Sequence, residues 1–142
     1  MEPSADALSS VDSLSCEPGT PAVTLFVCRT CRLAAEDKEA QPGGEALLAT
    51  TTRLPRGSDI SVRGVRCLSN CKRGLSAAMV RTDGWTYVFG DLTLDSGSDL
   101  LAGATLFSTS PDGLMPWRGR PDCLKRGMIA RVPPLSISED NP

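Results

Sequence analysis

The chain has 142 residues, which suffices for one compact domain with loose ends and is too short for two ordinary domains. It contains no histidine, which excludes Ser-His-Asp and Cys-His catalysis, mixed Cys/His zinc sites and Rieske-type ligation. No stretch approaches the roughly 20 apolar residues that span a membrane, and residues 1–21 lack the apolar segment of a secretory signal. Six cysteines without an export signal predict a cytoplasmic protein whose thiols are ligands or redox groups.

The charge of the chain is unevenly distributed. Six of its 17 acidic residues lie in the two tails, whereas all 15 basic residues fall between Arg29 and Arg131. The central part is therefore net positive, although the formal net charge of the whole chain is −2. This modest excess, without a recognised binding motif or aromatic platform, argues against nucleic-acid binding.

The first predicted elements are a strand, a helix and a second strand. Residues 22–27 form an apolar, β-branched run that predicts a buried strand leading to Cys28. Apolar residues recur at helical spacing over 45–54, and a Pro-Arg-Gly sequence ends this predicted helix. Alternating apolar residues over 59–65 predict a second strand, which runs into Cys67.

A hairpin and another helix follow. Strands are predicted over 75–81 and 85–89, because the Thr-Asp-Gly sequence between them is a strong hairpin signal. Leucine, alanine and phenylalanine at helical spacing predict a helix over 98–109, with Ser98 as its N-cap.

Composition divides the chain into three parts. Residues 1–21 are rich in serine, proline and acid, and we expect a disordered tail there. Residues 22–110 contain all of the predicted elements above and form the expected domain. Residues 111–142 are rich in proline and glycine, which predicts an irregular extension that packs on the domain and frays at its end, with extended character only over 128–132.

The order β-α-β-β-β-α predicts an α/β domain with a mixed sheet. The first three elements form a right-handed parallel crossover, and the later strands form an antiparallel hairpin. Such a sheet resembles the thioredoxin fold. Because Cys28 and Cys67 follow two parallel neighbouring strands, both are expected at the same edge of the sheet.

Two cysteine pairs carry the candidate chemistry. A Cys-x2-Cys pair stands at Cys28 and Cys31, and a Cys-x3-Cys pair stands at Cys67 and Cys71. Four thiolates satisfy a 2Fe–2S cluster and equally satisfy a four-cysteine zinc site. Zinc ribbons usually place their pairs about 15–20 residues apart, whereas a helix and a strand are predicted between these pairs. The first pair also occupies the place of a thioredoxin redox motif, although the proline expected opposite that motif is absent.

Basic residues flank both pairs, and no acid lies within two positions of any of the four cysteines. A 2Fe–2S cluster with four thiolates carries a charge of −2 when oxidised and −3 when reduced. Neighbouring cations should therefore favour the reduced form, raise the potential relative to the about −400 mV of plant-type ferredoxins, and steer a partner. The residues predicted to act in this way are Arg29, Arg32, Arg66, Lys72 and Arg73.

Two resemblances follow from these motifs. The two cysteine pairs, with Lys-Arg-Gly after the second, resemble those of thioredoxin-like 2Fe–2S ferredoxins, although the first pair is narrower here. Four segments resemble a family of small bacterial proteins that are usually labelled predicted metal-binding and are often encoded near cobalamin-synthesis genes. These segments are Val23–Cys28, Cys67–Cys71, Gly84-Trp85 and Pro116-Trp117-Arg118-Gly119-Arg120-Pro121.

The sequence thus predicts a non-enzymatic 2Fe–2S protein that acts as a one-electron carrier or redox adaptor. The resemblance implies redox partner proteins, with the cobalamin pathway as their expected source, and homodimers occur among the resembling ferredoxins. One alternative is a four-cysteine protein that binds zinc or cobalt for storage, delivery or sensing. A second alternative is a thioredoxin-like dithiol oxidoreductase.

Other candidates lie outside the four cysteines. Trp117, Arg118 and Arg120 combine an indole with two guanidiniums between prolines. Exposed, they would dock an acidic partner or a phosphate-bearing ligand; folded back, Trp117 would cap the sheet and shield the site. Cys16, in the tail, is expected to be an idle thiol, and Cys123 is expected to be a small buried hydrophobe or a substitute ligand.

Overall fold

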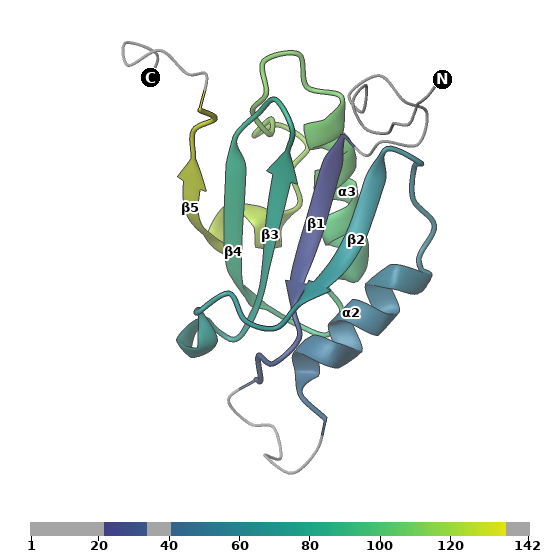
Figure 1. The fold of residues 1–142 in the computed structure, drawn as a ribbon, viewed down its shortest axis with the longest axis vertical. Helices are drawn as coiled ribbons and strands as arrows, with labels where there is room; N and C mark the ends of the chain where they lie inside the picture. Colours follow the sequence, from purple (N-terminus) through teal and green to yellow (C-terminus); the bar gives the residue numbers. More distant parts are fainter. Residues whose placement is uncertain (1–21, 34–40, 136–142) are drawn as a thin grey trace, which may run out of the picture.

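A five-stranded mixed sheet forms the centre of this computed structural model, with α2 and α3 on one of its faces (Figure 1). The structure describes residues 22–33 and 41–135, so the predicted tail with Cys16 and the frayed end lie outside the described residues. The strands are β1 Val23–Cys28, β2 Ile60–Val65, β3 Leu75–Arg81, β4 Thr86–Leu92 and β5 Met128–Val132. The helices are α2 Gly43–Arg53, the 3-10 turn η2 Cys71–Arg73, α3 Gly97–Ser108 and α4 Asp122–Arg126.

The strand order is β2-β1-β3-β4-β5, and this mixed topology confirms the predicted α/β, thioredoxin-like sheet. β1 and β2 are parallel, with Val23 opposite Ile60 and Cys28 opposite Val65. The other neighbouring strands are antiparallel. The crossover through α2 therefore brings the end of β2 beside the end of β1, where the cysteines begin.

The hydrophobic core lies between the sheet and the helices. Alternate residues of β1 are fully buried, whereas Thr24 and Phe26 between them are only partly covered. Although aromatic residues are few, three of them pack together in this core. The centre of the Tyr87 ring lies 5.2 Å from that of Phe107, in an edge-to-face arrangement, and 6.2 Å from that of Phe89. None of the helices in the described ranges has the length and apolar character needed to cross a bilayer.

The predicted cap of α3 is wrong. The helix begins at Gly97, and Ser96 rather than Ser98 occupies the cap position. A β-carbon at Gly97 would lie 2.7 Å from the Thr51 hydroxyl, so the missing side chain lets α3 pack closely on α2. The turn before the helix is closed locally, because the Thr93 N–H donates to the Ser96 hydroxyl at 3.0 Å and the Ser96 N–H donates to the Thr93 carbonyl at 3.1 Å.

The C-terminal extension is more regular than the sequence predicts. The expected extended segment 128–132 is present as β5, which pairs with β4 and becomes the fifth strand of the sheet. The short helix α4 was not expected, because five residues carry too little periodicity to predict a helix. Leu124 holds α4 in place by filling the space above Gly103 of α3, where a β-carbon would clash with it.

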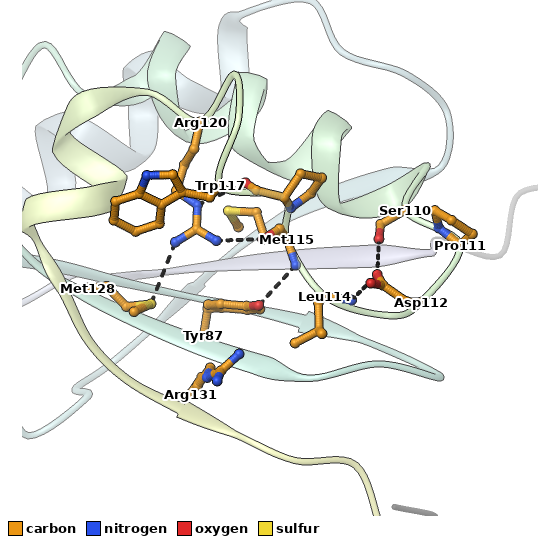
Figure 2. A pocket seen from close by; sticks show the side chains of 11 residues that line it. Tyr87, Ser110, Pro111, Asp112, Leu114, Met115, Trp117, Arg120, Met128 and Arg131 are labelled. Carbon is orange, nitrogen blue, oxygen red and sulfur yellow. Dashed lines mark hydrogen bonds between the residues drawn. The ribbon is translucent and has the colours of Figure 1, made fainter. Parts of the chain in front are cut away.

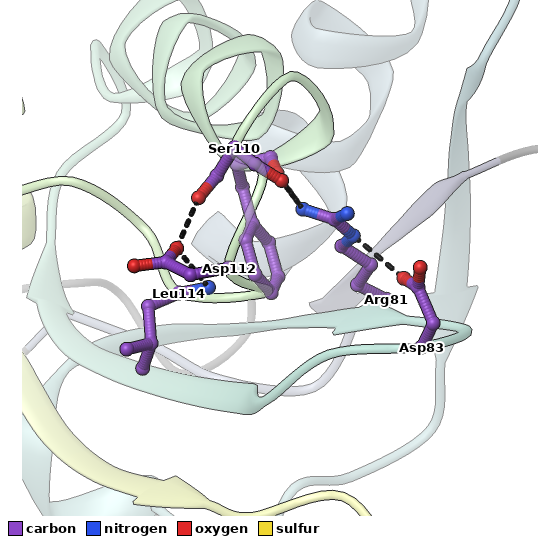
Figure 3. Close-up of polar contacts among 6 residues, drawn as sticks. Arg81, Asp83, Ser110, Asp112 and Leu114 are labelled. Carbon is purple, nitrogen blue, oxygen red and sulfur yellow. Dashed lines mark hydrogen bonds and ion pairs between the residues drawn. The ribbon is translucent and has the colours of Figure 1, made fainter.

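Arg81 joins the end of β3 to the end of α3. Its guanidinium donates to the carbonyl oxygens of Phe107, at 2.6 Å, and Ser110, at 2.7 Å, and to the Asp83 carboxylate, at 2.7 Å (Figure 3). Beyond this contact, the Asp112 carboxylate accepts from the Ser110 hydroxyl and from a backbone N–H. Arg81 and Asp112 together fix the direction in which the chain leaves α3.

We predict that Arg81→Gln lowers the free energy of unfolding by about 1–3 kcal/mol, because buried carbonyl groups at the end of α3 lose a charged donor. Urea denaturation followed by circular dichroism measures the change. Arg63→Gln, on the exposed part of β2, is the matched control and should change stability by less than about 0.5 kcal/mol. Equal losses in the two variants would contradict the role given to Arg81.

Candidate metal centre

The first cysteine pair lies at the carboxyl end of β1. Cys28 and Cys31 are both buried, and their sulfur atoms are 3.1 Å apart. The Arg29 N–H donates to the Val65 carbonyl of the neighbouring strand at 2.9 Å, and the Gly44 N–H donates to the Cys31 carbonyl at 2.9 Å. The pair is therefore held between the end of β2 and the beginning of α2.

Gly44 allows α2 to approach the first pair. A β-carbon at this position would overlap the carbonyl oxygen of Cys28, and it would lie 3.1 Å from backbone atoms of Arg29. The close approach therefore requires glycine at this point of the helix. Glu45, the next residue of α2, forms an ion pair with Arg29, with 2.9 Å between its carboxylate oxygen and the guanidinium nitrogen.

The second pair belongs to the segment between β2 and β3. Cys67 and Cys71 are exposed, in contrast to the first pair. Ser69 has a positive φ of 59°, and its N–H donates to the Cys67 sulfur at 3.1 Å. Asn70 donates its side-chain N–H to the buried Ser76 hydroxyl at 2.8 Å, which fixes the segment to β3.

Several contacts connect the two pairs. The Thr30 hydroxyl donates to the Arg66 carbonyl at 2.7 Å, and the Cys28 sulfur lies 4.0 Å from the same oxygen. The backbone N–H of Leu68 also donates to Cys28. On the other side, Cys71 is close enough to raise the pKa of Cys31 by charge repulsion. The structure thus gathers both pairs at one edge of the sheet, while within the described residues no three potential ligands are already arranged around a single ion.

The two buried thiols differ in acidity. Burial by itself would raise the pKa of Cys28, but hydrogen bonds from the Cys31 thiol and from the Leu68 and Thr30 N–H groups outweigh it, and the pKa is lowered. Burial raises the pKa of Cys31 to about 12, with further contributions from Cys28 and Cys71. Cys28 is consequently the thiol that becomes a thiolate first, with Cys31 as its hydrogen-bond donor.

The five flanking basic residues do not form a free positive rim. Arg29 pairs with Glu45, and Arg73 pairs with Asp91 at 2.7 Å. Both acids come from elements distant in sequence, the first turn of α2 and the end of β4, and sequence analysis missed them. A glutamate directly after a Pro-Gly-Gly helix start was the one available signal.

Two of the other flanking basic residues, Arg32 and Lys72, line a hollow beside Cys71. It has a volume of about 370 Å³ and is lined by both basic and acidic residues. Its lining residues are Arg32, Leu33, Cys71, Lys72, Gly74, Asp91, Leu92 and Thr93. Arg66 is exposed, and its carbonyl contacts Thr30.

The other candidates lie elsewhere. Trp117 is 59% exposed, so the alternative in which it folds back to cap the sheet and shield the cysteines is wrong. Arg118 is also exposed, and Arg120 is the member of this loop that is buried. Trp117 and Arg120 line a cavity beside β4 and β5. Cys123, on α4, donates to Asp99 at 3.6 Å, and burial with this acid raises its pKa to about 11.

Comparison with known proteins now identifies the family. Residues 25–134 match the family model described as "Protein of unknown function (DUF1636)". The chain belongs to this family. No curated protein matches the chain in sequence.

A solved structure supports the description of the fold. The thioredoxin-like [2Fe-2S] ferredoxin from Aquifex aeolicus is similar with a TM-score of 0.51, at 13% identity, over 84% of this chain and 100% of that chain. At this identity the likeness shows the thioredoxin-like fold of the DUF1636 chain.

We predict that Gly44→Ala destabilises the protein by about 1–3 kcal/mol, because α2 must move away from the Cys28 carbonyl. Chemical denaturation measures this loss. Gly57→Ala is the control, since a β-carbon there meets only the end of the Asp59 side chain. If the two variants were equally stable, the approach of α2 to the first cysteine pair would not be a tight one.

Proposed function

We propose that the protein is a non-enzymatic one-electron carrier or redox adaptor that holds a 2Fe–2S cluster on Cys28, Cys31, Cys67 and Cys71. The observation that carries the proposal is the grouping of the thiols as two pairs from separate segments at one sheet edge. A 2Fe–2S cluster takes two thiolates on each iron, so paired thiols match its ligand set. The 2Fe–2S content of the similar ferredoxin agrees with this proposal.

The surroundings of the sulfur atoms fit a negatively charged cluster. Backbone N–H groups of Ser69 and Leu68 donate to Cys67 and Cys28, and such donors stabilise cluster thiolates. Lys72 adds positive charge in the hollow beside Cys71. Bound there, a 2Fe–2S group would supply one-electron chemistry.

The two pairs differ in exposure, and this difference indicates from which side a partner would approach the site. Cys28 and Cys31 are covered by the core, whereas Cys67 and Cys71 face solvent. A redox partner protein would therefore approach the Cys67–Cys71 segment, guided by the exposed Arg66 and Lys72 beside it. From the sequence resemblance we propose a partner in cobalamin synthesis and a cytoplasmic location.

A dithiol oxidoreductase is the second candidate, and the acidity of the first pair favours it. Cys28 has a lowered pKa and lies 3.1 Å from Cys31, whose pKa is raised to about 12. An attacking thiolate beside a resolving thiol has this arrangement. Both thiols are buried, however, and a disulfide substrate needs access to the attacking sulfur.

We predict that the protein purified without oxygen is red-brown, bleaches with dithionite, and contains iron and acid-labile sulfide in equal amounts. Cys67→Ser should abolish the colour, because one thiolate ligand is lost. Cys123→Ser is the matched control and should keep it, since Cys123 lies on α4. Colourless protein with one zinc ion per chain, or coloured protein that contains cobalt but no iron or acid-labile sulfide, would support a metal-handling protein. Metal-free protein with reversible Cys28–Cys31 oxidation would support the dithiol.

We predict that Asp91→Asn raises the reduction potential, because Arg73 loses its counter-charge while asparagine tolerates the positive φ of 56° at this position. Arg66→Gln should lower the potential by removing a nearby cation. Spectroscopic redox titration measures both. Asp59→Asn, at the far end of the β1–β2 pair, is the control and should leave the potential unchanged. Identical potentials in all variants would show that these charges do not act on the cluster.

A further inference from the structure

A second cavity lies apart from the cysteines, between β4, β5 and the loop that leads from α3 to α4 (Figure 2). Its volume is about 580 Å³, which is within the usual range for a small-molecule site. Its walls combine thioethers and aromatic rings with two guanidinium groups and one carboxylate. The lining residues used below are Tyr87, Asp112, Met115, Trp117, Arg120, Met128 and Arg131.

Arg120 is a buried cation with neutral partners. Only 7% of the residue is exposed. Its guanidinium donates to the Pro116 carbonyl at 3.1 Å, to the Met115 carbonyl at 2.5 Å and to the Met128 sulfur at 3.7 Å. Among the residues that the structure describes, no carboxylate pairs with it. An arginine stays charged even when buried, so this position lacks a compensating anion.

Aromatic rings enclose the guanidinium on both sides. It lies 5.1 Å from the centre of the Trp117 ring and 5.6 Å from that of Tyr87. Figure 2 shows these three side chains together at the cavity. The Tyr87 hydroxyl accepts from the Met115 N–H at 2.9 Å, which keeps the loop against the sheet. These contacts hold Arg120 in a fixed position before any ligand arrives.

Arg131 brings a second cation to the same cavity from β5. It is exposed, and its guanidinium lies 4.6 Å from the centre of the Trp85 ring. Its charge is close enough to lower the pKa of Arg120, although burial has the larger effect. Two guanidiniums that repel each other across one cavity would both be stabilised by an anion between them.

The cavity also provides apolar contact area. Trp117 is 59% exposed, although an indole of this size is usually well buried, and Met115 and Met128 contribute thioethers. Asp112, the acid in the lining, already accepts from the Ser110 hydroxyl at 2.5 Å and from the Leu114 N–H at 3.1 Å. Asp112 is thus occupied in holding the loop rather than in neutralising the arginines.

We propose that this cavity binds a small organic anion, with its carboxylate or phosphate between Arg120 and Arg131 and its apolar body against Trp117 and Met128. Holding the loop explains the bonds from Arg120 to the two carbonyls. It does not explain the second cation at the same cavity or the exposed indole beside it. The proposal is independent of the cysteines and of the function proposed for them.

Isothermal titration calorimetry of the full chain tests this with benzoate, phenyl phosphate and inorganic phosphate. Saturable binding of benzoate or of phenyl phosphate is expected, and the tighter of the two identifies the anionic group. Inorganic phosphate should bind at least tenfold more weakly than phenyl phosphate. Equal affinities of the two phosphates, or no saturable binding of any probe, would overturn the proposal.

Variants locate the binding. Arg131→Gln should weaken it at least tenfold without unfolding the protein, because Arg131 is exposed on the last strand. Arg118→Gln removes an exposed arginine of the same loop outside the cavity lining and should leave the affinity unchanged. If both substitutions weakened binding equally, the effect would come from the overall charge of the protein, and the proposed site would be refuted. Cys67→Ser should bind the probe like the unaltered chain, which separates this result from the cluster assay.

Discussion

The parallel pairing of β1 with β2 is the constraint on which the candidate centre depends. It sets Cys28 opposite Val65, so the two cysteine pairs, separated in sequence by α2 and β2, emerge at one edge of the sheet. The Thr30 hydroxyl then ties the first pair to the Arg66 carbonyl at the start of the second segment. A shift of one residue in this register would turn Cys28 to the other face of the sheet and separate the pairs.

At this edge of the sheet, the first cysteine pair is buried and the second is exposed to solvent. Burial and hydrogen bonding give the first pair one acidic and one weakly acidic thiol, whereas the second pair is exposed on a short segment fixed by Asn70 and Ser76. Redox centres need protection from solvent and access for a partner at the same time. In the function proposed above, the buried pair meets the first requirement and the exposed pair meets the second.

The C-terminal segment forms the β5 edge of the sheet, opposite the β2 edge. Strand β5 extends the sheet, and Arg81 fixes the end of α3. The loop from α3 to α4 then folds over β4 and forms a cavity lined by the buried Arg120. One small thioredoxin-like domain therefore contains two chemically different features, the group of four cysteines and the cavity beside Arg120. We propose a sulfur-ligated cluster for the first and a small organic anion for the second.

Local pattern in the sequence was sufficient for the strands, the two main helices, the hairpin and the pairing of the cysteines, because periodicity and turn residues act over a few neighbours. β1 and α2, for example, differ from their predicted ranges by only one or two residues at each end. Tertiary structure alone decided the close packing of α3 on α2 at Gly97, the helix α4 and the neutralisation of Arg29 and Arg73 by Glu45 and Asp91. Each of these depends on a contact between distant segments, for which the sequence near either partner carries no periodic signal.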